Sequence, residues 1–178
     1  GIGDKHVPWI HNVKNTDVVT DIDDEDCMRL LRLFNEKAGQ EYLSANGVDP
    51  EFTAKLWMIG ISGIANILSA IKTAKYFGMT SDDILMTIAT DSAEMYRSRL
   101  NELNEERGEY SLMQAARDHE KCMIGASIDY MKELSYHDRK AIHNLKYFTW
   151  VEQQGKEVDE LRQLWDDRQI WQHLFNQP

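Results

Sequence analysis

The pattern of apolar residues changes near residue 100, and this change constrains the fold more than any other feature. Before it, short β-branched or apolar runs alternate with segments whose apolar residues recur at helical spacing. After it, only the helical spacing remains. Strands that alternate with helices are typical of an α/β domain with parallel strands. We therefore expect an α/β part over residues 1–100 and an all-helical extension over residues 101–178.

Three units, each made of a short apolar run, a turn and a helix, can be followed through the first part. The apolar runs cover residues 17–22, 56–59 and 83–89. The helices that follow them are expected over residues 23–39, 64–78 and 93–107. The extension predicts further helices over residues 110–134, 136–154 and 158–175, with breaks at Ser135 and Gly155.

These runs are too few for a complete parallel sheet. A parallel sheet that is covered by helices on both faces usually contains about five strands. We therefore expect part of a three-layer domain, in which a few parallel strands carry helices on both faces and the missing strands come from elsewhere. Ligands of such sheets bind at the carboxyl ends of the strands. Residues 90–92 follow the strand predicted over residues 83–89 and are therefore a candidate binding site.

Charge and composition argue against several classes of partner. A net charge of −10 repels polyphosphate and anionic bilayers, so we expect neither nucleic acid nor a membrane as the main partner. The least polar stretch, residues 57–68, is shorter than the about 20 residues that a membrane span needs. The two cysteines, Cys27 and Cys122, are too few for a disulfide framework. With no secretory signal in the opening residues, they indicate a cytoplasmic protein.

Three motifs resemble catalytic or metal-binding motifs but are better explained by structural roles. Residues 60–63 begin like a hydrolase nucleophile elbow, but an isoleucine follows where that turn needs glycine, so Ser62 is expected to be structural. Residues 21–26 are acidic but lack the glycine and distal glutamate of a calcium loop, and should open a helix. His119 and Cys122 have the spacing of two metal ligands, yet no matching second pair is obvious, so we predict no metal site.

The remaining candidate side chains are histidines, aromatic residues and one serine. His6 and His11, near Trp9, are expected in a polar surface loop. Aromatic residues of the extension are expected to pack between helices or subunits: Tyr147, Phe148, Trp150, Trp165 and Trp171. Two interpretations of Ser92 stay open, because its hydroxyl could cap the following helix or face a ligand at the sheet edge.

Several of these segments, taken in order, match the C-terminal portion of a known enzyme class. They are Gly1-Ile2-Gly3, Pro8, residues 17–39, residues 60–63, Thr90-Asp91-Ser92 and Tyr96. In this order and spacing, about the first hundred residues resemble fold-type II pyridoxal 5'-phosphate enzymes such as cysteine synthase (O-acetylserine sulfhydrylase) and cystathionine β-synthase. The extension from about residue 101 has no counterpart in the short cysteine synthases.

The resemblance implies where the cofactor would bind. It implies that the Gly1-Ile2-Gly3 loop borders the site and that the Ser92 hydroxyl hydrogen-bonds the pyridine nitrogen. A neutral hydroxyl in place of a carboxylate leaves the ring unprotonated, which suits β-replacement or β-elimination on a serine- or cysteine-like amino acid. The resemblance therefore assigns pyridoxal 5'-phosphate as the cofactor and the following residues to its binding: Gly1, Ile2, Gly3, Asp91 and Ser92.

The sequence also departs from this class. Thr90 replaces the usual proline, and residues 60–63 hold one serine where cysteine synthases often have two. The Schiff-base lysine, the substrate-carboxylate loop and the phosphate cup belong to the N-terminal part of such enzymes and have no match here. We therefore expect no catalytic residue in this chain and no activity from it alone. Its expected partners are an amino-acid substrate, the N-terminal portion of the same enzyme and further copies in a homo-oligomer.

A non-catalytic alternative stays open. In it, the acidic surface and the helices of residues 110–175 bind a protein partner, and Ser92 only caps a helix. The polar turns gathered at strand ends favour the enzyme, because an interaction module has no need for them.

Overall fold

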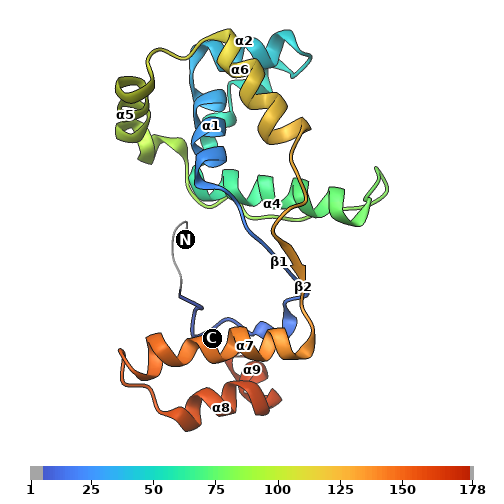
Figure 1. Ribbon diagram of the computed structural model, residues 1–178, viewed down its shortest axis with the longest axis vertical. Coiled ribbons are helices and arrows are strands. Elements are labelled where there is room, and N and C mark those ends of the chain that lie inside the picture. The colour runs from blue at the N-terminus through green and yellow to red at the C-terminus, as the bar shows by residue number, and fades with distance from the viewer. Residues whose placement is uncertain (1–5, 177–178) are drawn as a thin grey trace. The chain divides into compact units, whose positions relative to one another are not determined.

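The computed structural model describes residues 6–176 and consists mostly of helices (Figure 1). Its elements are η1 (Val13–Asn15), β1 (Val18–Thr20), α1 (Asp24–Asn35), α2 (Lys37–Ala45), α3 (Pro50–Thr53), η2 (Leu56–Met58), α4 (Ile61–Phe77), η3 (Ala93–Tyr96), α5 (Arg97–Arg107), α6 (Leu112–His119), η4 (Glu120–Ile124), β2 (Met131–Glu133), α7 (Tyr136–Lys146), η5 (Tyr147–Val151), α8 (Val158–Asp166) and α9 (Arg168–Phe175). The elements η1 to η3 are 3-10 helices, and η4 and η5 are π-helices.

The chain divides into two compact units, and each is described separately. Within the described residues, unit 1 is Thr20–Tyr130, and unit 2 joins the residues up to Val19 to those from Met131 onward. The expected domain boundary near residue 100 falls inside α5 of unit 1. Helix α6, which was expected to begin the extension, instead packs against α1 and α2 in unit 1.

Unit 1 is built around α1, which packs against α2, α4 and α6. The Asp23 carboxylate accepts a hydrogen bond from the Glu25 N–H and so begins the helix. Acidic residues in the first turn lie at the positive end of the helix dipole, which stabilises them. The buried apolar residues of α1 are Cys27, Leu30, Leu31, Leu33 and Phe34. The prediction that residues 23–26 open a helix is therefore confirmed.

The expected helix over residues 23–39 is in fact two helices. The chain turns at Glu36, whose backbone is extended (φ −85°, ψ 144°). Gly39 does not end a helix but lies buried inside α2, where an added Cβ would be 2.1 Å from the Leu33 carbonyl oxygen. Only a residue without a side chain lets α2 pack this closely against the end of α1. Gly78 does end α4 as predicted, with a left-handed φ of 61°.

Of the three predicted strands, those over residues 56–59 and 83–89 are absent from the structure, and the one over residues 17–22 is present. Residues 56–59 contain η2, and residues 83–89 form no strand and are exposed, with Ile84 at 85% and Met86 at 92% exposure. Residues 17–22 do contain β1, but its partner is β2, which lies where a helix was expected. Short apolar runs alone cannot distinguish a strand from a turn or an exposed loop, because the distinction depends on which partner covers them.

The one sheet among the described residues is the pair β1–β2. The Leu134 N–H donates to the Asp17 carbonyl (2.8 Å) and the Asp21 N–H donates to the Tyr130 carbonyl (3.0 Å), so the pairing is antiparallel. The structure thus mixes helices with a little strand, as expected, and helices predominate. Within residues 6–176 it forms no parallel sheet with helices on both faces.

The helices of unit 2 follow the predicted breaks. Helix α7 begins after Ser135, whose hydroxyl and the Asp138 carboxylate cap the helix reciprocally. The second break lies at Gly155, which has a left-handed φ of 70°. The helix expected over residues 136–154 is present as α7, which continues without a break into the π-helix η5. The helix expected over residues 158–175 is divided at Asp167, whose backbone is extended, into α8 and α9.

Candidate functional site

Two segments that the sequence singled out lie side by side in unit 1. The Gly60 N–H donates a hydrogen bond to the Asp91 carbonyl (2.8 Å). An added Cβ on Gly60 would be 2.4 Å from Asp91 Oδ1, so glycine is required for this approach. The Asn66 side-chain amide of α4 donates to the Ile88 carbonyl (2.9 Å) and fixes the chain just before Asp91. The start of α4 therefore holds the turn at residues 90–92.

The Asp91 carboxylate organises this turn. It accepts hydrogen bonds from the Tyr96 hydroxyl and from the Thr90 hydroxyl (3.0 Å). The bond from Tyr96 is the main reason that the pKa of Asp91 lies below its ordinary value, and it raises the pKa of Tyr96. Because the Asp91 carboxylate is engaged within the turn, it fits a structural role better than direct contact with a cofactor.

Ser92 follows Asp91 and precedes η3, where a serine normally caps a helix. In the described part of the chain its side chain makes no capping hydrogen bond to η3, and the residue is half-buried. Ser92 thus occupies the N-cap position of η3 without a capping bond from its side chain, and its hydroxyl is able to donate to a ligand. The other residues assigned to the cofactor, Gly1, Ile2 and Gly3, lie outside the described residues.

The Ser92 hydroxyl has the chemistry to hydrogen-bond a pyridine nitrogen. A pyridine nitrogen that is unprotonated accepts one hydrogen bond, and the Ser92 hydroxyl is a donor of the right kind. The space into which a Cβ of Gly60 would project is filled by Asp91. The hydrogen-bonding chemistry of Ser92 alone is therefore compatible with a pyridine nitrogen.

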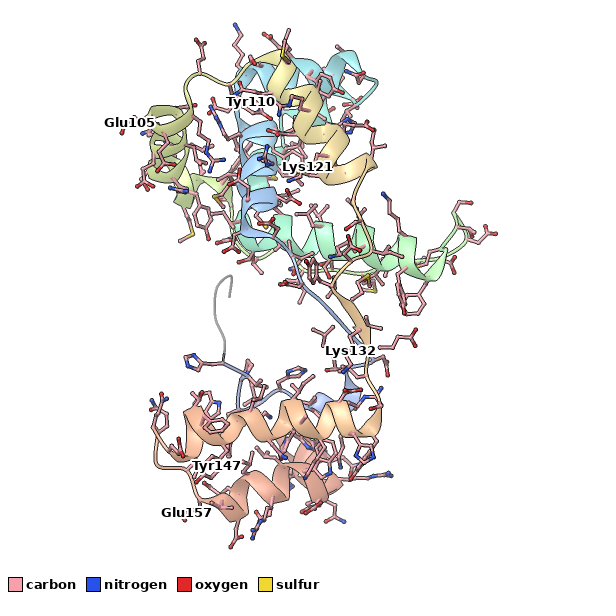
Figure 2. All side chains as sticks on the ribbon, in the orientation of Figure 1. Glu105, Tyr110, Lys121, Lys132, Tyr147 and Glu157 are labelled. Atoms are coloured by element: carbon pink, nitrogen blue, oxygen red, sulfur yellow. The ribbon has the colours of Figure 1, made fainter. Side chains whose placement is uncertain are left out.

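A cavity in unit 1 was not foreseen from the sequence. It has a volume of about 490 Å³ and lies between the start of α1, α4 and η4. At its wall, Lys121, labelled in Figure 2, pairs with Asp26 (2.8 Å), and the Cys122 thiol donates to the same carboxylate (3.5 Å). Burial and the negative charge of Asp26 raise the pKa of Cys122 to about 12, so this thiol is protonated and unreactive at neutral pH.

His119 and Cys122, which have the sequence spacing of two metal ligands, contact different neighbours. The ring of His119 packs against Tyr42 (5.6 Å between centroids), whereas the Cys122 thiol contacts Asp26. Among residues 6–176, no group of three or more histidine, cysteine or acidic side chains is arranged to hold a metal ion.

The aromatic and histidine predictions for unit 2 are partly confirmed. Trp165 and Trp171 are buried, as expected of residues that pack between helices, but Phe148 is 56% exposed. His11 lies in an exposed loop as predicted, and its ring hydrogen-bonds the Thr16 hydroxyl (2.8 Å). Sequence reasoning missed Lys146, a buried lysine in this unit. Its position on the apolar face of a predicted helix was the available signal.

Comparison of the chain with protein-family models, with curated proteins and with solved structures found no match. No single described helix is both long enough and apolar enough to cross a membrane. The segments Pro50–Met58 and Ile61–Phe77 are long and apolar enough only when taken together, and the chain bends by 119° between them.

Proposed function

We propose that this chain is the C-terminal part of a fold-type II pyridoxal 5'-phosphate enzyme that acts on a serine- or cysteine-like amino acid by β-replacement or β-elimination. The observation that carries the proposal is the contact of Gly60 with Asp91. This contact lies next to Ser92, whose side chain makes no capping hydrogen bond. Both segments belong to the ordered set of motifs on which the resemblance rests, and a chance match in sequence would have no reason to bring them together.

Ser92 is the residue that would hold the pyridine nitrogen. When bound, the cofactor supplies an electron sink for the bonds at the α-carbon of the substrate. A hydroxyl donates a hydrogen bond to the nitrogen without contributing a negative charge, so it does not favour protonation of the ring. Asp91 and Tyr96 fix the backbone that carries Ser92 and so orient its hydroxyl.

The exposed segment of residues 83–89 supports the remainder of the proposal. Its backbone has no strand partner among residues 6–176, and its exposed apolar side chains include Ile84, Met86 and Ile88. Such a segment is a template for pairing with further strands. We assign those strands to the N-terminal portion of the same enzyme, which would complete the parallel three-layer sheet. The proposed enzyme is a cytoplasmic homo-oligomer, and its cytoplasmic location is supported by the two cysteines, which are buried free thiols.

The test is the absorbance spectrum of the full-length protein that carries this chain. We expect a band from bound cofactor in the near-ultraviolet to visible range. Ser92→Ala should change the position of the band or weaken activity while leaving the fold intact, and Ser92→Asp should favour the protonated ring. Ser62→Ala, at the start of α4, is the matched control and should leave the spectrum unchanged. Absence of the band after addition of pyridoxal 5'-phosphate would overturn the proposal.

One observation favours the non-catalytic alternative, a helical module that binds a protein partner. Unit 2 has an open apolar groove of about 340 Å³ formed by α7, η5 and α8. Its apolar lining includes Tyr147, Phe148 and Leu161. If the full-length protein lacks the cofactor band, this groove is the surface at which a partner should be sought.

A further inference from the structure

A small pocket of unit 1 carries an unusual concentration of positive charge. It has a volume of about 100 Å³ and is lined by residues of α1, α6 and the end of α5. Four of its lining side chains are arginines: Arg29, Arg32, Arg107 and Arg117. Among the described residues, Asp118 is the only carboxylate in this lining, so four guanidinium groups and one carboxylate give it a formal charge of +3. In a chain whose net charge is −10, this arginine pocket is a local site that attracts an anion.

Arg32 is buried and held in a fixed orientation. Its side chain is 3% exposed, and its Nη2 donates to the Asn104 side-chain oxygen (2.5 Å) and to the Gly108 carbonyl (2.7 Å). Its guanidinium also lies 4.8 Å from the centre of the Tyr110 ring. In the described part of the chain, its Nε has no hydrogen-bond partner. The protein thus fixes this guanidinium without satisfying all of its donors, and a buried donor without a partner is costly.

The carboxylate in the lining is already engaged on both oxygens. Asp118 is 6% exposed, and it accepts one hydrogen bond from Arg29 (3.0 Å) and another from the Tyr110 hydroxyl (2.8 Å). Burial and the hydrogen bond to Asp118 raise the pKa of Tyr110, so its phenol keeps its proton and remains the donor. Asp118 therefore neutralises Arg29 and leaves the charge of the other arginines to different partners.

Arg117 differs from the other three arginines of the pocket. Each of those meets a carboxylate, at 3.0 Å from Arg29, 2.6 Å from Arg107 and 3.8 Å from Arg32. Within residues 6–176, no hydrogen bond or ion pair engages the Arg117 side chain, which is exposed on α6. Gln114 lies one turn earlier on the same helix, and its amide oxygen is occupied in capping α6, so the group that it can offer a ligand is its NH2. The pocket therefore offers more donors than the protein itself uses.

We propose that the arginine pocket binds a phosphate group, with Arg117 and Arg32 as its main donors and the Gln114 NH2 as a further donor. Planar guanidinium groups match phosphate oxygens with paired hydrogen bonds. A phosphate group carries about two negative charges at neutral pH, which matches the charge of the lining better than the single charge of a carboxylate. The volume of the pocket is that of about three water molecules, at about 30 Å³ each, which suits one tetrahedral oxyanion. This site goes beyond the proposed enzyme and does not depend on it, because no described residue of the pocket lies in the turn at residues 90–92.

The experiment measures arginine modification by phenylglyoxal in the full-length protein, at rising concentrations of inorganic phosphate. Phenylglyoxal reacts with accessible guanidinium groups, and mass spectrometry of the peptides reports each arginine separately. Arg97 is the internal control, because it lies on α5 of the same unit with 77% of its side chain exposed and does not line the pocket. We expect phosphate well above its Kd to slow modification of Arg117 about tenfold or more and to leave that of Arg97 unchanged.

Substitution tests the same site through its affinity. Arg117→Gln removes one guanidinium from an exposed position, so the fold should be kept, and Arg97→Gln is its matched control. Calorimetric titration with inorganic phosphate should show about tenfold or more weaker binding for Arg117→Gln and no change for Arg97→Gln. Methyl phosphate separates the two sources of the group. Binding as tight as that of inorganic phosphate assigns the pocket to a phosphorylated small molecule, and clearly weaker binding assigns it to the free ion.

Three results would overturn the phosphate site. They are modification of Arg117 that phosphate does not slow, acetate binding as tight as phosphate binding, and an equal loss of affinity in both variants. The last result would show a nonspecific effect of charge. Because the cofactor band is measured independently, a protein that lacks this band can still bind phosphate here, and the two proposals fail separately.

Discussion

At the scale of single residues, burial shifts the titration of several groups away from their ordinary behaviour. Cys27 and Cys122 are each 1% exposed, and burial together with nearby aspartates raises the pKa of both thiols to about 12. Lys146 shifts in the opposite direction for the same physical reason, because burial disfavours the charged form. These thiols are therefore core residues with no nucleophilic role.

The thiols should be unreactive in the folded chain at pH 9. An unfolded thiol loses its proton near 9.0, whereas the folded thiols keep theirs up to about 12. The folded state thus binds more protons in this range, and its stability should fall as pH rises from 9 toward 12. Alkylation at pH 9, followed by mass spectrometry, should modify neither thiol in buffer and both in denaturant. Ser127→Cys adds an exposed thiol that should react in both conditions, and equally fast native alkylation of Cys122 would contradict the prediction.

At the scale of elements, the packing of unit 1 depends on how closely α2 approaches the end of α1. Gly39 makes this approach possible because it has no side chain. Helix α2 contacts both α1 and α6, so a shift at Gly39 would be transmitted to the core. The glycine therefore contributes to stability through close packing rather than through a turn.

Gly39→Ala should destabilise the chain by about 1–3 kcal/mol, because the new methyl group would overlap the Leu33 carbonyl and force the helices apart. Lys37→Ala is the control, since the Lys37 side chain is 90% exposed and in the same helix. Denaturant unfolding followed by circular dichroism measures both. An equal midpoint for Gly39→Ala and the unsubstituted chain would mean that the backbone relaxes freely at this point.

At the scale of the whole molecule, residues 83–89 of unit 1 form an apolar segment that is exposed to solvent. It has no strand partner among the described residues, and its side chains are among the most exposed large apolar groups there. In the proposed enzyme the missing strands cover it. In the chain alone it should instead pair with another copy of itself.

The chain by itself should therefore self-associate, and a double variant Met86→Lys with Ile88→Lys should reduce this. Charges on an exposed strand-like edge oppose pairing between copies. Met113→Lys is the matched control, because Met113 is 73% exposed but lies on helix α6. Light scattering as a function of concentration measures the change. A stable monomer before any substitution would count against an unpaired strand at this position.

Features that depend only on neighbouring residues could be predicted from the amino-acid sequence. The acidic start of α1, the left-handed end of α4 at Gly78 and the cap at Ser135 follow from local hydrogen bonds and backbone preferences. The turns at residues 60–63 and 90–92 were also visible as motifs, although their contact through Gly60 and Asp91 was not.

The contacts between these elements could not be predicted in this way and are known from the folded structure. Strand β1 pairs with β2, more than a hundred residues away in the chain, and Lys146 meets carbonyls separated from it by 137 and 135 positions. Gly39 is required because the Leu33 backbone packs directly against it. No local sequence pattern predicts this contact. Local propensity acts over a few residues, whereas strand pairing, close helix contacts and the burial of a charge depend on segments that meet only after folding.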